Sequence, residues 1–331
     1  MEKIAKEFFI SKSGKDLDDF VDVVFNHYRK VGFPYLPTNR GYRLNRYEDL
    51  MEADIDHVLQ QNVINRTQHG ISLAWSYFPH AFAVKCVKMI TPIEAFNDDV
   101  MFKRIIRKVA KMTDGISDSS MRNILRLFSG VQAVSNFRPT AAAALYKHYA
   151  KQGVVWDMSG GWGGRLLGAV RANVEYYIAT EPSIKTVKGL NELGNDFFKD
   201  RFKIEIKGSE VYKPQKNSLS MCFTSPPYFD LEKYADEPTQ SFKKFSSKEQ
   251  WVEGFLYETL ANCYYGLKKQ GYCLINIADP KKDKGISLEQ ETIKAAQRIG
   301  FKHVNTLVLV LKSPLGSGAL LKQEPVFVFK K

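Results

Sequence analysis

From about residue 136 onward, short apolar segments alternate with helix-like segments, and this alternation restricts the fold more than any other feature. The segments with strand character are 154–156, 176–180, 202–206, 220–223, 272–277, 304–311 and 326–329. The segments with helical character are 141–149, 166–172, 184–198, 251–267 and 288–299. Strands that alternate with helices of this length form βαβ units around a parallel sheet. The sequence therefore predicts an α/β fold with a mostly parallel, seven-stranded sheet.

The N-terminal part of the chain has a different pattern, which is mainly helical. Apolar residues from Leu17 to Tyr28 recur at the spacing of one helix face. Ser129-Gly130 interrupts the helical pattern just before the alternating segments begin. We therefore expect a helical, basic domain over residues 1–130 and a second domain over residues 131–331.

The chain is strongly basic, with a formal net charge of +12 and an isoelectric point near 9.3. Such an excess favours a polyanionic partner, with nucleic acid ahead of a membrane surface. A soluble protein that is merely basic would have the same totals, so charge alone leaves that alternative open. If nucleic acid is the partner, we expect the helical domain to recognise it.

The sequence lacks the signals of a metal site or of membrane targeting. The cysteines Cys86, Cys222, Cys263 and Cys273 form no CxxC pair, and the six histidines are scattered. The N-terminus has no apolar core of a signal peptide, and no apolar run approaches the length of a membrane span. We expect a cytoplasmic protein without a metal and without membrane association.

A glycine-rich turn, residues 157–165, follows the first expected strand directly. Gly161 and Gly163 form a G-x-G core at the point where backbone approaches a ligand and a helix N-terminus faces it. The Lys-Ser/Thr pair of a P-loop is missing. Glu181 ends the second strand about 20 residues after Asp157, where an acid can bind ribose hydroxyls. Structural turns also produce G-x-G, but the combination favours a nucleoside cofactor.

The segment Ser225-Pro226-Pro227-Tyr228 follows the fourth expected strand. Two prolines fix the backbone and remove its N–H donors, but their carbonyls remain acceptors. The exocyclic amine of a nucleobase could donate to the Ser225 hydroxyl oxygen and the Pro226 carbonyl while its ring stacks on Tyr228. A proline-stiffened turn at a strand end has the same composition. These residues alone leave both interpretations open.

The sequence resembles the amino-methyltransferases that use S-adenosylmethionine (SAM) to methylate DNA bases. Four features carry this resemblance: the segment 136–140, the turn 157–165, Glu181 and the Ser225–Tyr228 segment, which we call the SPPY motif. The resemblance covers roughly residues 135–330 and implies a Rossmann-like class I methyltransferase fold with SAM as cofactor. The SPPY form is similar to the N4-cytosine branch, since the N6-adenine branch usually has Asp in place of Ser225. Similar short motifs occur in RNA methyltransferases that act on guanine and adenine amines.

The resemblance also implies roles for individual residues. The catalytic motif would be Ser225, Pro226, Pro227 and Tyr228. The cofactor site would be Asp157, Gly161 and Gly163 for the methionine moiety, Glu181 for the ribose, and Phe137 and Thr140 as pocket lining. Two departures from the family pattern are Met158-Ser159, where the family often has Pro-Phe, and Gly208-Ser209-Glu210, where an Asp usually meets the adenine amine.

The expected activity is that of a site-specific DNA methyltransferase acting on N4 of a flipped-out cytosine. N6-adenine methylation, RNA base-amine methylation and an inactive nucleic-acid-binding protein remain alternatives. DNA is the expected partner, with RNA as the alternative. A cognate restriction enzyme fits such an activity, although no feature of the sequence indicates one. The sequence does not predict the oligomeric state or the recognition sequence.

Three basic segments carry candidate contacts to the phosphate backbone. The residues are Arg40, Arg43 and Arg46 in an Arg- and Tyr-rich segment, Lys103, Arg104 and Arg107 on a helical segment, and Lys243 and Lys244 in the insertion 230–247. Each segment also has an ordinary explanation. An irregular loop needs the same Pro, Gly and Tyr, most basic helix faces are simply solvated, and the insertion could be a surface loop.

Overall fold

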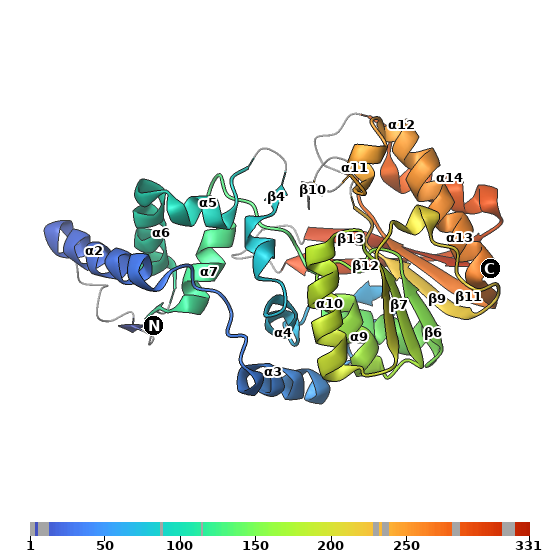
Figure 1. Cartoon of the computed structure of the whole chain (residues 1–331), viewed down its shortest axis with the longest axis horizontal. Coiled ribbons are helices and arrows are strands. Elements are labelled where there is room, and N and C mark those ends of the chain that lie inside the picture. Colours follow the sequence, from blue (N-terminus) through green and yellow to red (C-terminus); the bar gives the residue numbers. More distant parts are fainter. Residues whose placement is uncertain are drawn as a thin grey trace. The chain divides into compact units, whose positions relative to one another are not determined.

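The computed structural model describes residues 4–5, 13–86, 89–113, 115–227, 232–233, 238–279, 285–312 and 322–331. The chain divides into two compact units (Figure 1). Unit 1 consists of Met1–Pro37, Pro79–Ser135 and Glu232–Tyr234. Unit 2 consists of Thr38–Phe78, Asn136–Leu231 and Ala235–Lys331. Residues 38–78, which we expected in the N-terminal domain, are thus part of unit 2.

Unit 1 is mainly helical. Its main helices are α2 (Gly14–Val31), α5 (Pro92–Asn97), α6 (Asp99–Met112) and α7 (Asp118–Leu127), with a short 3-10 turn η1 (Pro79–Ala83). Its strands form two antiparallel pairs, β1 (Ile4–Ala5) with β5 (Gly115–Ile116), and β4 (Lys85–Cys86) with β10 (Glu232–Lys233). The predicted helix over Leu17–Tyr28 lies within α2, and its apolar face shares one core with that of α6.

Unit 2 is built on a nine-stranded sheet of order β2-β3-β12-β13-β11-β9-β6-β7-β8. Its strands are β2 (Leu59–Gln60), β3 (Val63–Ile64), β6 (Val154–Asp157), β7 (Tyr176–Thr180), β8 (Phe202–Glu205), β9 (Leu219–Thr224), β11 (Leu267–Asn276), β12 (Lys302–Lys312) and β13 (Lys322–Lys330). The strands from β8 to β11 are parallel, and β13 is antiparallel to both of its neighbours. The predicted Rossmann-like α/β fold is confirmed, with all seven expected strands present.

The two additional strands come from residues 38–78. Strand β3 pairs in parallel with β12, with Val63 opposite Val308, and β2 pairs with β3. The same segment contributes the helices α3 (Arg40–Glu52) and α4 (Ile71–Trp75). Strands of two residues are too short to produce a period-2 pattern, so the sequence did not predict this extension of the sheet.

Helices cover both faces of the sheet (Figure 1). They are α8 (Pro139–Leu145), η2 (Tyr146–Ala150), α9 (Gly164–Ala172), α10 (Ile184–Phe197), η3 (Ser209–Val211), α11 (Ser241–Lys244), α12 (Lys248–Trp251), η4 (Val252–Tyr257), α13 (Glu258–Gly266) and α14 (Leu288–Ile299). Among the described residues, no helix is both long and apolar enough to cross a membrane. No group of three or more His, Cys, Asp or Glu within the same residues could hold a metal ion.

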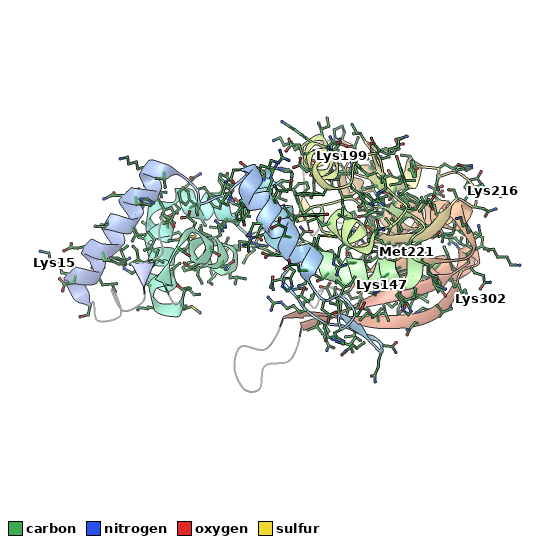
Figure 2. The ribbon with its side chains drawn as sticks, turned by 90° about the horizontal axis from the view of Figure 1, so that it is seen from below. Lys15, Lys147, Lys199, Lys216, Met221 and Lys302 are labelled. Atoms are coloured by element: carbon green, nitrogen blue, oxygen red, sulfur yellow. The ribbon has the colours of Figure 1, made fainter. Side chains whose placement is uncertain are left out.

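Alternating residues of the central strands separate the two faces. On β9, Cys222 belongs to the core shared with α13 and α14, whereas the ring of Phe223 contacts Phe137 and Tyr146. Figure 2 shows Met221 enclosed among the side chains of unit 2, while the labelled Lys216 extends outward. This alternation is that of a sheet buried on both faces.

The strand order reverses at one position of the sheet. After β6 the chain continues to β7 and β8 on one side, and then β9 and β11 continue on the other side of β6. In open α/β sheets, ligands bind outside the carboxyl ends of the strands at such a switch point. The carboxyl ends of β6 and β9 are therefore the expected position of the site.

Candidate methyl-transfer site

The glycine-rich turn and the SPPY motif lie side by side at the switch point. Strand β6 ends at Asp157 and the adjacent parallel strand β9 ends at Thr224. Asp157 is in register with Phe223, and the Thr224 hydroxyl donates to Asp157 Oδ1 over 3.3 Å. The turn after β6 and the Ser225-Pro226 segment after β9 thus leave the same edge of the sheet from neighbouring strands.

Asp157 is fully buried below the turn. Its Oδ2 accepts a hydrogen bond from Arg165 Nε at 2.8 Å and another from the Tyr177 hydroxyl at 2.6 Å. Arg165 also donates to the Ser159 carbonyl, so the pair ties the end of β6 to the start of α9. The Asp157 carboxylate therefore anchors the turn from inside. Its contact with the methionine moiety stays a prediction.

The turn needs glycine at three positions. Gly163 lies in the left-handed region, with a φ of 74°, and a Cβ there would also lie 2.9 Å from two neighbouring side chains. Gly161 has a φ of 55°, in the left-handed region, and a Cβ there would lie 3.6 Å from its nearest neighbours. Gly164 is instead enclosed, since a Cβ would lie 1.9 Å from the Phe137 carbonyl oxygen and 2.6 Å from Asn136 Oδ1. The segment before α8 is thus packed directly on the turn, and Asn136 Nδ2 donates to the Trp162 carbonyl at 2.8 Å.

We expect Gly164→Ala to destabilise the protein by about 3 kcal/mol, the upper end of the usual cost of overpacking, because the new methyl group would overlap backbone that cannot move alone. Gly161→Ala is the matched control, and we expect it to lose only about 1–2 kcal/mol because its strain is confined to one left-handed residue. Urea unfolding of both variants measures the difference. Equal losses for the two variants would contradict the described packing.

Glu181 lies one residue past β7 and faces the turn. Its Oε2 accepts a hydrogen bond from the Gly161 N–H at 3.1 Å, and its Oε1 accepts one from the Ser183 N–H at 3.0 Å. Burial raises the pKa of Glu181 to about 7, although the hydrogen bonds from Ser183 and Gly161 act in the opposite direction. Each carboxylate oxygen keeps a lone pair for a further donor. This geometry suits a carboxylate that binds a diol beside the turn.

Phe137 and Thr140 have different surroundings. The half-buried Phe137 ring meets Phe223 edge-to-face at 5.1 Å between centroids, so it lies next to the end of β9. Thr140 is fully buried, and its hydroxyl forms a hydrogen bond with that of Thr67. Phe137 is close to the SPPY strand, whereas Thr140 contributes to the packing of α8 against residues 38–78. The pocket-lining role of both residues stays a prediction.

The Ser225 hydroxyl has a defined partner. It donates to Asn276 Oδ1 at 2.8 Å, and Asn276 Nδ2 donates in turn to the Pro325 carbonyl at 3.0 Å. A carbonyl can only accept, so Pro325 fixes which end of the Asn276 amide faces Ser225. The single proton of the Ser225 hydroxyl is thereby used, and its oxygen is left as an acceptor. Tyr228 lies outside the described residues.

Asn276 is a site residue that sequence reasoning missed. It is buried at the carboxyl end of β11, next to β9 in the sheet. The available signal was a polar residue inside the apolar segment 272–277. Without the strand order, nothing in the sequence pairs that residue with Ser225.

Most of the predicted phosphate-binding residues in unit 2 contact other groups of the protein. Arg43 stacks over Tyr77 at 3.6 Å and donates to the Ser76 carbonyl, while Arg46 pairs with Asp49. Lys244 pairs with Glu210 at 2.7 Å, and Lys243 next to it is exposed. Arg40 is exposed and forms no ion pair within the described residues.

The predicted basic face of α6 in unit 1 is partly neutralised. Lys103 pairs with Asp22 at 2.6 Å and Arg107 with Asp18 at 2.7 Å, so α6 is joined to α2 by ion pairs along their length. Arg104 is exposed and has no such partner among the described residues. The ion pairs between α6 and α2 are sufficient to explain why Lys103 and Arg107 are basic, without a contact to nucleic acid. Their predicted phosphate contacts stay a prediction.

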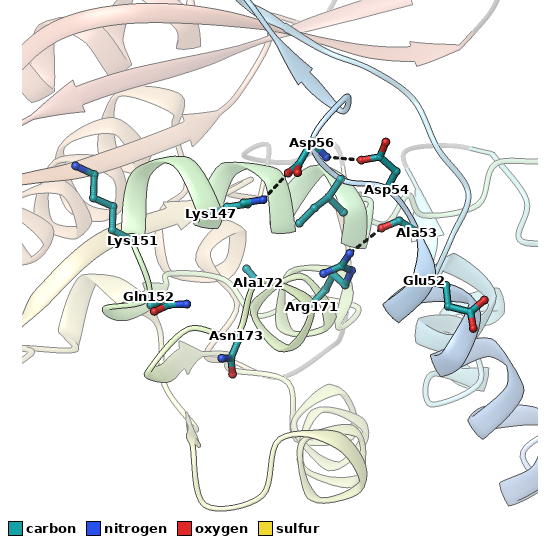
Figure 3. Close-up of a pocket in the computed structure, with 11 residues that line it drawn as sticks. Glu52, Ala53, Asp54, Asp56, Lys147, Lys151, Gln152, Arg171, Ala172 and Asn173 are labelled. Atoms are coloured by element: carbon teal, nitrogen blue, oxygen red, sulfur yellow. Dashed lines mark hydrogen bonds and ion pairs between the residues drawn. The ribbon is translucent and has the colours of Figure 1, made fainter.

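A polar cavity of about 590 Å³ lies at the opposite edge of the sheet. Its lining residues precede β6 and β7 in the chain, or lie at the end of α3 and just after it, so the cavity is at the amino ends of these strands. Figure 3 shows Lys147 directed to Asp56 and Arg171 directed to the carbonyl of Ala53. These contacts fasten residues 53–56 to η2 and α9. The cavity is therefore separate from the site at the carboxyl ends.

Residues 219–331 match the family model of the N6_N4_Mtase group, described as DNA methylase. The matched region contains the strand that leads to SPPY, the Asn276 strand and the final β-hairpin. The predicted resemblance to the amino-methyltransferase family is confirmed by this match. No curated protein matches the sequence.

Several solved structures resemble the chain weakly. A SAM-dependent O-methyltransferase from Thermotoga maritima is 13% identical, with 60% of this chain and 67% of that chain covered and a TM-score of 0.40. A 1,6-didemethyltoxoflavin-N1-methyltransferase from Burkholderia thailandensis with bound S-adenosylhomocysteine is 13% identical, with coverage of 57% and 76% and a TM-score of 0.41. A SAM-dependent methyltransferase from Aquifex aeolicus is 14% identical, with coverage of 59% and 99% and a TM-score of 0.38. Values this low carry no argument about activity.

Proposed function

We propose that this protein is a SAM-dependent methyltransferase that modifies an exocyclic amine of a DNA base, with N4 of cytosine as the preferred target. The observation that carries the proposal is the Ser225–Asn276–Pro325 chain of hydrogen bonds. It leaves an acceptor oxygen at the end of β9, one residue before Pro226, whose carbonyl is the proposed second acceptor. Two acceptors placed together suit the two N–H donors of an amine and reject a carbonyl group.

The residues present also fit the cofactor. Glu181 offers a carboxylate next to the glycine-rich turn, where it accepts a hydrogen bond from the Gly161 N–H. A nucleoside would place its ribose hydroxyls on Glu181 and its remaining part along the turn toward the end of β9. When bound, SAM supplies an electrophilic methyl group on a positively charged sulfur.

The protein's contribution to transfer is orientation and electrostatics. The lone pair of an exocyclic amine is delocalised into its ring, so the nitrogen is a poor nucleophile. Hydrogen bonds from both N–H groups to Ser225 Oγ and the Pro226 carbonyl favour a tetrahedral nitrogen whose lone pair points at the methyl group. With SAM bound, transfer would form a nitrogen–methyl bond, with S-adenosylhomocysteine as the leaving group and one amine proton released to solvent. No covalent enzyme intermediate is required.

The target base would have to leave the double helix to reach these acceptors. Tyr228 is proposed to replace the lost stacking. Cytosine is placed before adenine because Ser225 stands where the N6-adenine branch usually has Asp, which is an argument from family resemblance. N6-adenine and RNA amines remain the alternative targets of the same pocket.

The affinity for SAM is expected to depend on Glu181 and on pH. Because burial raises the pKa of Glu181 to about 7, the carboxyl is mostly protonated at pH 6 and ionised at pH 8. A carboxylate accepts ribose hydroxyls better than a carboxylic acid. Affinity measured by calorimetry should therefore rise about tenfold from pH 6 to pH 8. Glu181→Gln should bind more weakly at pH 8 and lose most of this dependence; an unchanged pH profile in that variant would reject the ribose role.

Transfer of a labelled methyl group from SAM tests the proposed activity. The protein is incubated with labelled SAM and with mixed-sequence DNA or RNA, and label is counted in the purified polymer. We expect incorporation into DNA that exceeds incorporation into RNA. Incorporation into RNA alone would favour the RNA alternative, and no incorporation into either polymer would favour the inactive nucleic-acid-binding alternative.

A further inference from the structure

Two arginines lie at the edge of the sheet that carries Ser225. Arg66 lies two residues past the end of β3, and β3 runs parallel to β12. Arg138 reaches the end of β12, where its Nη2 donates to the Leu311 carbonyl at 2.8 Å and its Nη1 to the Val310 carbonyl at 3.4 Å. Both side chains therefore belong to the carboxyl edge.

The two guanidinium groups act on each other electrostatically. Burial lowers the pKa of Arg138, and the positive charge of Arg66 lowers it further. The negative charge of Glu324 raises the pKa of Arg138, but this effect is smaller than the lowering by Arg66. Neither arginine forms an ion pair within the part of the chain that the structure describes. A positive pair without a paired carboxylate is a site for an anion.

Both arginines keep donors that no neighbour uses. A guanidinium has five N–H donors, and Arg138 Nε is buried without a hydrogen-bond partner in the described structure. With the Gln68 amide oriented to suit its neighbours, its oxygen accepts from Arg66 Nε at 2.9 Å and Nη2 at 2.6 Å. This leaves Nη1 of the exposed Arg66 available while its side chain is held in place.

The two arginines differ from most of the arginines and lysines predicted from sequence. Arg43, Lys103, Arg107 and Lys244 are each within ion-pair distance of an aspartate or glutamate, which neutralises them. Arg66 and Arg138 keep their positive charge at the edge of the sheet that holds the proposed site.

We propose that Arg66 and Arg138 bind a backbone phosphate of the nucleic-acid strand whose base enters the Ser225 site. Strand β12 is three strands from β9 in the sheet order, which corresponds to about 14 Å. Phosphates of one DNA strand are spaced about 3.4 Å along the helix axis, so the bound phosphate lies within about four nucleotides of the target. This inference rests on the proposed function and names the residues that hold its polymer substrate.

The test is equilibrium binding of a fluorescent 20-base-pair DNA duplex, without cofactor, over a range of salt concentrations. Arg66→Gln should weaken binding about tenfold, as expected for the loss of a charge-assisted hydrogen bond. The slope of log affinity against log salt should decrease by about 0.9, the value for one phosphate contact. Arg66 is exposed, so the variant should fold normally.

Arg201→Gln is the matched control. Arg201 precedes β8 at the opposite edge of the sheet, where it donates to Asn173, and its variant should keep wild-type affinity and slope. Wild-type binding by Arg66→Gln, or equal losses in both variants, would overturn the proposal. Binding is measured without methyl transfer, so the two proposals are tested separately. The binding result could reject the phosphate contact while methyl transfer is still observed, and the phosphate contact could be found in a protein that transfers no methyl group.

Discussion

Ser225→Ala is expected to lower turnover by about 10²–10³-fold, which is the usual effect of removing one preorganised hydrogen bond to the charge that develops in a transition state. The variant loses the acceptor oxygen that Asn276 holds in place, so the amine nitrogen stays closer to planar. SAM binding should not change, because the hydroxyl faces Asn276 rather than the glycine-rich turn. Single-turnover methyl transfer and calorimetry measure the two quantities separately.

Ser218→Ala is the matched control for this variant. Ser218 precedes β9 at its amino end, and its hydroxyl donates to the Gln215 carbonyl. The Ser218→Ala substitution also removes one serine hydroxyl, but at the other end of β9 from the site. Turnover of this variant should therefore stay at the wild-type level. Turnover of Ser225→Ala within a factor of two of wild type would contradict the proposed role of the hydroxyl.

Asp157→Ala is expected to reduce the free energy of unfolding by about 3–5 kcal/mol, because it leaves the Arg165 guanidinium buried without its carboxylate. Both side chains of the pair are almost fully buried, at 0% and 7% exposure. The loss should also loosen the glycine-rich turn that Arg165 fastens to β6. Urea denaturation measures the change.

Two further variants isolate the buried charge as the cause. Replacing both partners, Asp157→Leu with Arg165→Met, should recover much of the stability, since a buried pair replaced by apolar groups is often neutral. Arg298→Gln breaks an exposed pair with Glu253 and should leave the free energy of unfolding close to the wild-type value. A loss in Asp157→Ala as small as that of Arg298→Gln would contradict the anchoring role.

The α/β fold of unit 2 could be predicted from sequence because the pattern of each strand and helix is contained in one short segment of the chain. Buried parallel strands are continuous apolar runs, and the helices between them repeat with a period that is visible in the sequence. Once the strands are known, Asp157 and Glu181 fall at strand ends, and so does the SPPY motif. Their adjacency follows from the topology of a parallel sheet.

The rest depends on contacts between distant parts of the chain. Residues 38–78 join unit 2 through β3, whose two residues carry no pattern of their own. Asn276 becomes a site residue only because β11 lies next to β9. Lys103 and Arg107 looked free because their partners on α2 are more than 80 residues earlier in the chain. Charge counts along a sequence do not reveal such neutralisation.

The most direct test of the proposed chemistry is the identity of the modified nucleoside. DNA incubated with the protein and isotope-labelled SAM is digested to nucleosides and analysed by mass spectrometry. We predict a methyl group on an exocyclic amine, as N4-methylcytosine. N6-methyladenine would keep the amine mechanism but reject the cytosine preference. A methyl group on a ring carbon, as in 5-methylcytosine, would contradict the mechanism, because the acceptors at Ser225 and Pro226 act only on an N–H donor.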